Sequence, residues 1–139
     1  MNYYLDTNTC IFFLRGTHPT LLHGVLSKNP NTIKIPAIVV AELIHGAEKS
    51  LDSVKNLEHV KKFLIPFEIV PFDIWAAYSY GKIRSSLEKR GQIIGPNDLI
   101  IAATVLSQNG ILVTNNTKEF TRVENLAIED WTKYDDTAS

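Results

Sequence analysis

Four carboxylates in apolar surroundings are the residues of this sequence best suited to chemistry. Asp6 ends a short β-prone start, and Glu42 is the only charged residue in the run 35–44. Asp98 opens an apolar segment, and Glu119 follows the next apolar run. An ionised carboxylate is costly to bury without a partner, and no Lys or Arg lies close in sequence to the first three acids. Several acids with few basic partners are the usual arrangement for a hard divalent cation such as Mg²⁺ or Mn²⁺. Such an ion activates water and stabilises charge on a phosphoryl group.

Each of these residues also has a simpler explanation when it is taken alone. Aspartate is common in turns, which accounts for Asp6, and an aspartate in the first turn of a helix caps it, which accounts for Asp98. Glu42 alone is compatible with an exposed helical stripe. Thr7 and Asn8 are better explained as helix caps than as ligands. Periodicity does not show that the acids converge, so the functional hypothesis depends on the whole set.

The segment 95–120 is predicted to position two of the acids. A Gly-Pro pair begins a helix, where proline is tolerated in the first turn, and nearly every residue from Leu99 to Leu106 is apolar. This helix is therefore expected to be buried. After an Asn-Gly turn, residues 111–113 have the composition of a parallel strand covered on both faces. Ligands bind beyond the carboxyl ends of such strands, where residues 114–119 are expected to form a polar loop.

The remaining chain alternates between strand and helix patterns. Predicted strands cover 2–5, 32–35, 68–70 and 126–128, and predicted helices cover 9–15, 20–28, 37–49, 54–64 and 73–90. Gly16 is expected to end the first helix, and Val54, Leu57, Val60 and Leu64 form the apolar stripe of the fourth. This alternation predicts one α/β domain in three α/β/α layers, with a mostly parallel sheet of four to five strands.

Composition limits the classes of function. The chain has 139 residues, 45% of them hydrophobic and 21% charged, which is typical of one soluble globular domain. No apolar run approaches the roughly 20 residues that span a bilayer, and the start lacks the pattern of a secretory signal. A cytoplasmic protein without membrane contact is expected. The single Cys10 lies in an apolar run and is predicted to be a buried hydrophobe, and the four histidines lack metal-ligand spacing.

Charge is close to balanced over the whole sequence. The formal net charge is −1, so the chain as a whole does not attract nucleic acid. Basic residues cluster at 82–90 and acidic residues crowd the C-terminus from Glu124 onward. Both clusters are interpreted as solvated faces.

The motifs, taken in order, resemble those of PIN-domain ribonucleases. They are Tyr4-Leu5-Asp6-Thr7-Asn8, Val40-Ala41-Glu42-Leu43 with Gly46-Ala47, Gly95-Pro96-Asn97-Asp98 and the run Val113 to Phe120. More narrowly, the sequence is similar to the VapC toxins of bacterial VapBC toxin–antitoxin pairs. A closing segment from Leu126 to Trp131 fits the same pattern, so the resemblance covers residues 1–131 as a PIN domain and leaves 132–139 as a loose tail.

The resemblance implies a Mg²⁺- or Mn²⁺-dependent endoribonuclease that arrests translation, with tRNA the substrate of several members. Asp6 and Asp98 would be the principal metal ligands, and Glu42 would complete the acidic site. Thr114 and Asn115 would shape its rim. One departure concerns Asn116, an amide where many PIN domains carry an acid, and Glu119 is the available substitute. The implied partners are a VapB-type antitoxin, an RNA and a second copy of the chain in a homodimer within a larger complex.

Two other classes of function are weighed beside this one. A PIN-like interaction module without catalysis would be expected to lack the acids, which are present. A metal-dependent small-molecule phosphohydrolase of the haloacid-dehalogenase type needs a second aspartate where Asn8 stands, and the GxxxxGK[ST] pattern of a nucleotide-binding switch is absent.

The reaction of the ribonuclease is expected to be phosphodiester hydrolysis that leaves 5′-phosphate and 3′-hydroxyl ends. A single-stranded loop is the expected target, because its bases are accessible.

A hydrophobic groove beside the acids is a further hypothesis. Phe12, Phe13 and Leu14 follow Asp6 closely, and the stripe on the helix 54–64 would form the other wall. Such a groove suits an amphipathic antitoxin helix, from which an Arg or Lys would enter the acidic cleft. The alternative, that these residues belong to the ordinary core, is equally compatible with the sequence.

Overall fold

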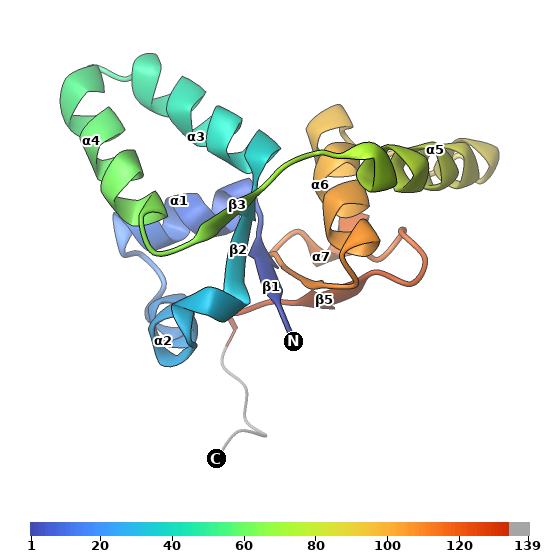
Figure 1. Ribbon diagram of the computed structural model, residues 1–139, viewed down its shortest axis with the longest axis horizontal. Coiled ribbons are helices and arrows are strands. Elements are labelled where there is room, and N and C mark those ends of the chain that lie inside the picture. The colour runs from blue at the N-terminus through green and yellow to red at the C-terminus, as the bar shows by residue number, and fades with distance from the viewer. Residues whose placement is uncertain (134–139) are drawn as a thin grey trace.

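The computed structural model of the protein describes residues 1–133. Within them, five strands form a single sheet in the order β3-β2-β1-β4-β5, and every neighbouring pair is parallel (Figure 1). The strands are β1 (Tyr3–Leu5), β2 (Ile33–Pro36), β3 (Glu68–Val70), β4 (Ile111–Val113) and β5 (Ala127–Glu129). The predicted parallel α/β architecture is confirmed.

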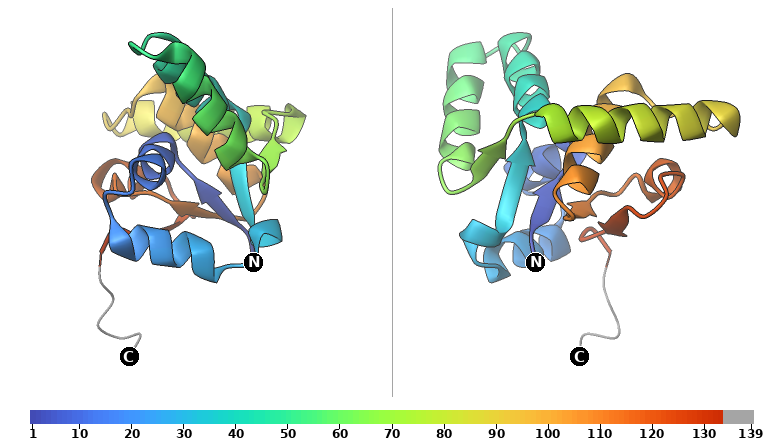
Figure 2. Two further views of the ribbon diagram at one scale, coloured as in Figure 1. Left: turned by 90° about the vertical axis from the view of Figure 1, so that its left-hand side faces the viewer. Right: turned by 45° about the vertical axis from the view of Figure 1, so that its right-hand side comes forward.

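Helices fill the connections between the strands. They are α1 (Thr7–Arg15), α2 (Pro19–Ser27), a 3₁₀ turn η1 (Pro30–Thr32), α3 (Ala37–Glu48), α4 (Ser53–Leu64), α5 (Ile74–Lys89), α6 (Pro96–Ser107) and α7 (Thr117–Phe120). The chain runs outward from β1 to β3 through α1–α4 and then returns past β1 to β4 through α5 and α6. Since such connections are right-handed, this reversal of direction places the two helix groups on opposite faces (Figures 1 and 2). The reversal point lies between β1 and β4, where open α/β sheets bind ligands.

The core is built around the neighbouring inner strands β1 and β4 and the buried helix α6. Leu5 and Leu112 are completely buried, and so are Ala102 and Ala103 in the middle of α6. The residue before β4 is Gly110, and a Cβ added to it would lie 2.2 Å from the ring of the buried Tyr4. Only glycine allows this close approach of strand and ring. The expected burial of this helix and of the strand that follows it is confirmed.

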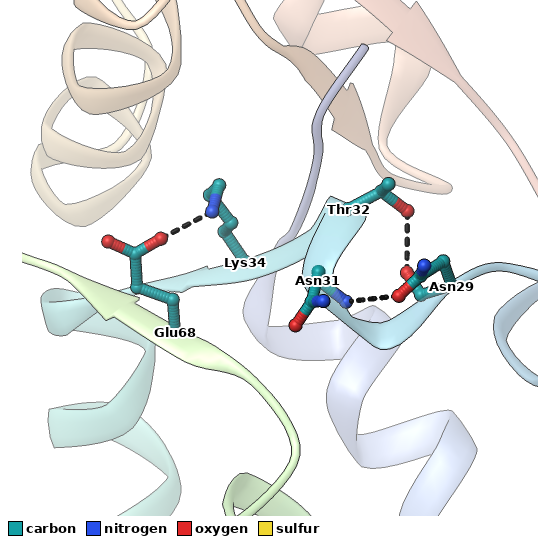
Figure 3. Close-up of polar contacts among 5 residues, drawn as sticks. All are labelled: Asn29, Asn31, Thr32, Lys34 and Glu68. Atoms are coloured by element: carbon teal, nitrogen blue, oxygen red, sulfur yellow. Dashed lines mark hydrogen bonds and ion pairs between the residues drawn. The ribbon is translucent and has the colours of Figure 1, made fainter.

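The register at the outer part of the sheet is marked by an ion pair. Lys34 on β2 and Glu68 on β3 are direct partners in the ladder, and their side chains pair across it (Figure 3). The preceding turn is closed by Asn29, whose side chain accepts a hydrogen bond from the Asn31 backbone at 3.0 Å. Its backbone carbonyl accepts one from the Thr32 hydroxyl at 2.7 Å. This turn delivers the chain into β2.

The structure differs from the sequence expectations at Val54 and in the segment after β4. Val54 belongs to the apolar stripe that was expected to form a groove wall but is 81% exposed, because it lies in the first turn of α4, at the end of that helix far from the sheet (Figure 1). The segment expected as a polar loop contains the short helix α7, which the fully buried Phe120 anchors. Most of the predicted tail, residues 134–139, falls outside the described residues, and the domain boundary at 131 remains a prediction. Among residues 1–133, no helix combines the length and apolar character needed to cross a membrane.

Candidate active site

Asp6 and Thr114 meet at the reversal point of the sheet. Asp6 directly follows β1 and Thr114 directly follows β4, and the last residues of these strands are partners in the ladder. The Thr114 hydroxyl donates a hydrogen bond of 2.5 Å to Oδ2 of Asp6, and the backbone N–H of Thr9 donates one of 2.9 Å to Oδ1. Asp6 is therefore the N-cap of α1, and the prediction that Thr7 or Asn8 caps this helix is wrong. Each oxygen of the carboxylate thus accepts one hydrogen bond, from Thr9 within α1 and from Thr114 after β4, and these bonds fix its orientation.

Burial dominates the electrostatics of Asp6. Its side chain is only 4% exposed, and this desolvation raises its pKa above the ordinary value. The hydrogen bonds from Thr114 and Thr9 act in the opposite sense, and the nearby charge of Asp130 raises the pKa further. Asp130 directly follows β5 and lies at the same edge of the sheet as Asp6. It was not among the sequence candidates, since it was placed in the acidic C-terminal cluster.

Glu42 reaches the site from α3. Its Oε1 accepts a hydrogen bond of 2.7 Å from the hydroxyl of Thr7 on α1, and its side chain is half-buried. Thr7 therefore connects α1 to α3 and holds one oxygen of the carboxylate, a role that sequence reasoning missed. The only available signal was a hydroxyl residue directly after the strand-end aspartate.

Asp98 lies in the first turn of α6, and its pKa is affected by the other three acids. Burial and the negative charges of Glu119, Asp6 and Glu42, in that order, raise the pKa of Asp98 to about 6. A hydrogen bond between the carboxyl groups of Asp98 and Glu119 acts in the same direction. Four acids from four segments of the chain are thus brought to one place. The sequence identified the acids, and the structure supplies their convergence.

The segment after β4 connects Glu119 to the rest of the site. The Asn116 side-chain amide donates a hydrogen bond of 3.2 Å to Oε2 of Glu119, and its backbone N–H donates one of 2.9 Å to the Thr114 hydroxyl. Asn115 is exposed, as a rim residue would be. Thr114 is fully buried beneath that rim and contacts Asp6 instead.

The four acids have no basic partner within residues 1–133. The ion pairs in that part of the chain are Lys34–Glu68 and Arg84–Glu88, and neither involves the site. In the same residues, no three His, Cys, Asp or Glu side chains form a ready-made metal cage. Mg²⁺ does not require one, because it is usually held by one or two carboxylates and several waters. A donor set of oxygen atoms with unbalanced negative charge fits such an ion.

A groove of about 1240 Å³ opens beside the acids between α1, α3 and α4. Thr7, Asn97 and Glu42 line its acidic end. The rest of the lining includes apolar and basic side chains: Ile11, Phe13, Leu14, Val60, Phe63, Arg15, Lys49 and Lys62. A groove lies in the expected position and is lined by Phe13, Leu14 and Val60. The other residues of the expected stripe do not line it: Val54, Leu57 and Leu64. Phe12 does not line it, because its ring packs against His18 with centroids 4.2 Å apart.

Comparison with known proteins agrees with this geometry. The family model described as "PIN domain" matches residues 3–126. The chain belongs to the PIN-domain family. Its relatives include Ribonuclease VapC2 of Rickettsia felis, 43% identical over 136 residues that cover 96% of this chain and 100% of the relative. The tRNA(fMet)-specific endonuclease VapC of Salmonella typhimurium is 39% identical over 131 residues, covering 94% of this chain and 98% of that protein.

A solved PIN-domain structure extends the likeness to the whole architecture. The chain superposes with a TM-score of 0.87 and 41% identity on a crystal structure described as VapBC2 from Rickettsia felis bound to a DNA fragment from their promoter. The match covers 94% of this chain and 99% of the other. The resemblance to VapC proteins is confirmed, and the relatives' names support nuclease activity for the group.

Proposed function

We propose that this chain is a divalent-metal-dependent endoribonuclease and the toxin of a toxin–antitoxin pair. The observation that carries the proposal is the convergence of Asp6, Glu42, Asp98 and Glu119 on a site without a basic partner. Relatives named as ribonucleases, one of them specific for a tRNA, support RNA as the substrate. A tRNA loop is the proposed target, because unpaired bases there are accessible. Cleavage of such an RNA would inhibit translation.

Asp6 and Asp98 would hold the metal, which we propose to be Mg²⁺ or Mn²⁺. Each oxygen of Asp6 accepts one hydrogen bond and retains a lone-pair direction for a cation. Glu42 has one oxygen engaged by Thr7, and its other oxygen accepts no side-chain hydrogen bond within residues 1–133. When bound, the ion would neutralise the acids, activate water and stabilise charge on the phosphate.

The acids of this chain would orient the water and the scissile phosphate for hydrolysis. The water oxygen forms a bond to phosphorus while the bond from phosphorus to the 3′ oxygen breaks, and the proton that the water loses is returned through the acids to the departing 3′ oxygen. This gives the expected 5′-phosphate and 3′-hydroxyl ends. The free oxygen of Glu42 and the carboxyl of Glu119 are the groups we propose to receive the proton of the water and to fix its direction. Thr114 and Thr7 act through Asp6 and Glu42 as positioning residues.

The direct test is RNA cleavage by the purified chain with and without metal. We expect cutting in Mg²⁺, loss of cutting with a chelator and loss in Asp98→Asn, with Glu124→Gln as a matched control at an exposed acid. Mapping the 5′ ends of fragments after brief expression would identify the RNA and the cut position. Wild-type cleavage by Asp98→Asn would overturn the site, and hydrolysis only of small phosphate esters would favour the phosphohydrolase alternative.

The groove is the proposed binding surface for an antitoxin. Solved relatives are described as VapBC complexes, which supports a partner of the VapB type. We propose that an amphipathic helix of this partner lays its apolar face against Phe13 and Leu14. A basic side chain of the partner would then reach Glu42 at the acidic end and compete with the metal. Such charge pairing would keep the nuclease inactive until the antitoxin is released.

The homodimer stays a prediction, and one exposed face supports it. Ile74, Trp75 and Tyr78 at the start of α5 are 61%, 66% and 64% exposed, and Phe72 lies just before them at 42%. Large apolar side chains gathered in this way are typical of an interface, and we propose a second copy of the chain as the occupant. Sedimentation of wild type and Trp75→Glu would test this. A monomeric wild type at micromolar concentration would contradict it.

A further inference from the structure

A basic strip runs along one face of α5, away from the acids. It consists of Lys82, Ser85, Ser86, Lys89 and Arg90, which surround a shallow hollow of about 600 Å³. Residues three, four and seven positions apart lie on one helical face, so the side chains of this strip point the same way. Gly81 borders the hollow and has open space where a side chain would begin.

Arg90 donates hydrogen bonds to the Gln92 side chain and the Arg122 carbonyl, but the two lysines of the strip have no such contacts within residues 1–133. The ion pairs within residues 1–133 are Lys34–Glu68 and Arg84–Glu88, so neither lysine of the strip has a carboxylate partner there. Lys89 and Arg90 complement the helix dipole at the end of α5. Lys82 lies in the middle of the helix, where the dipole gives it no stabilisation. The helix dipole therefore accounts for the charges at the end of α5 but not for that of Lys82.

Arg122 connects one end of the strip to the segment that carries Glu119. Nη2 of Arg90 donates a hydrogen bond of 2.7 Å to the carbonyl of Arg122. The backbone N–H of Arg122 donates one of 3.0 Å to the carbonyl of Glu119. Helix α5 also packs along α6, whose first turn carries Asp98 (Figures 1 and 2). The strip therefore lies on the helix that packs against the one carrying Asp98, and its Arg90 end is connected to the segment carrying Glu119.

We propose that the strip binds the phosphate backbone of the RNA on one side of the scissile bond. This inference depends on the proposed function. The acids repel phosphates and the net charge is −1, so the chain needs a local basic surface to retain a long RNA. The lysines supply point charges and the serines supply hydroxyl donors, the contacts that fix position without reading sequence. From Lys82 to Lys89 the strip extends about 10 Å along the helix axis, enough for neighbouring phosphates.

Salt-dependent binding tests this proposal directly. The variant Lys82→Gln/Lys89→Gln is compared with Lys55→Gln/Lys61→Gln, which removes two exposed lysines from α4 on the opposite side of the molecule (Figure 1). Both are made in Asp98→Asn so that the RNA stays intact. Affinity for a labelled single-stranded RNA is measured between about 50 and 200 mM salt. Loss of two phosphate contacts should lower the slope of log affinity against log salt by about 1.4 relative to the control.

Further variants show whether an effect arises from the lost charge or from damage to the fold, and whether the strip binds RNA or duplex DNA. Lys82→Arg/Lys89→Arg should keep the wild-type slope, because it keeps both charges. In the otherwise wild-type chain, the glutamine variant should raise KM for RNA several-fold and leave kcat unchanged. Equal slopes and equal KM for the strip and control variants would overturn the proposal. So would a loss confined to a DNA duplex of the same length. If wild type cuts no RNA at all, the proposed function fails, while the binding slopes still decide the role of the strip.

Discussion

The hydroxyl of Thr114 donates a hydrogen bond of 2.5 Å to Asp6, a residue 108 positions earlier in the chain. This contact joins the ends of the neighbouring strands β1 and β4 and holds a carboxylate that is almost fully buried. It also lowers the pKa of Asp6 against the effect of burial. The position of the first proposed metal ligand therefore depends on a residue that would not itself bind the metal.

Replacing this hydroxyl should reveal how much it contributes. We expect Thr114→Val to destabilise the metal-free protein by about 1–3 kcal/mol at pH 7, because Asp6 and the Asn116 N–H each lose a partner. Without this donor the pKa of Asp6 rises further, so the deficit should shrink as the pH falls and Asp6 protonates. Urea unfolding and a Mg²⁺ titration would measure both effects. Thr114→Ser keeps the hydroxyl and should lie close to wild type, and equal stability of the two variants would argue against this role.

Asp98 should make the metal-free protein less stable as the pH rises. Its pKa is raised to about 6, so the folded state binds the proton more tightly than the unfolded chain does. Stability at low pH is therefore lost between about pH 4 and 6. Asp98→Asn removes this loss and should be more stable at pH 7 by roughly 1–2 kcal/mol after screening by solvent, with no advantage near pH 4. Thermal unfolding in chelator across this range would measure it, and a variant less stable than wild type at pH 7 would refute it.

Glu119 and Asn116 offer a choice for the acid that completes the site. Glu119 accepts a hydrogen bond from Asn116, and its negative charge raises the pKa of Asp98, whereas Asn116 carries no charge. If Glu119 acts as the substitute acid, Glu119→Gln should weaken metal binding or slow cleavage well beyond the effect of Asn116→Ala. Cleavage rates of both variants across a Mg²⁺ titration would distinguish them. Wild-type activity of Glu119→Gln would assign it to the surface of the loop.

Charge placed in the groove should release the antitoxin and spare the nuclease. Phe13→Asp and Leu14→Asp introduce a carboxylate into the apolar lining, and we expect the affinity for the cognate antitoxin to fall about tenfold or more. Val60, the other wall residue considered from sequence, is only 6% exposed, so an aspartate there would damage the fold. Leu26→Asp, at an exposed site on α2 outside the groove, is the matched control. Unchanged affinity of both groove variants would place the antitoxin elsewhere.

The sequence was sufficient to predict the parallel α/β architecture and the acids, because period and composition are local signals. Asp98 was found from its place at the start of an apolar helix, and Glu42 from its isolation in an apolar run. What the sequence could not give was the identity of the donors that hold these acids. Thr7 looked like a helix cap, yet it contacts Glu42 from 35 positions away. A hydroxyl shows no periodic pattern that would reveal such a distant partner.

Burial of single side chains was also beyond the sequence. Val54 and Val60 belong to the same apolar repeat, but the first is 81% exposed and the second 6%. Val54 lies in the first turn of α4, whereas Val60 lies nearer its C-terminal end, where Phe63 of the same helix packs against Phe13 of α1. A repeat predicts which face of a helix is apolar but does not predict how much of its length is covered.

The pairing of β1 with β4 also sets the moment during synthesis at which the site can form. Asp6 leaves the ribosome early, but the Thr114 hydroxyl and the acid of α6 follow only after nearly the whole chain has been made. At about 5–20 residues per second, this delay is on the order of 5–20 s. A nascent chain therefore carries no assembled site during most of its translation. The groove walls α1, α3 and α4 emerge within the first half of the chain, so a partner that binds there has the opportunity to dock before the acids converge.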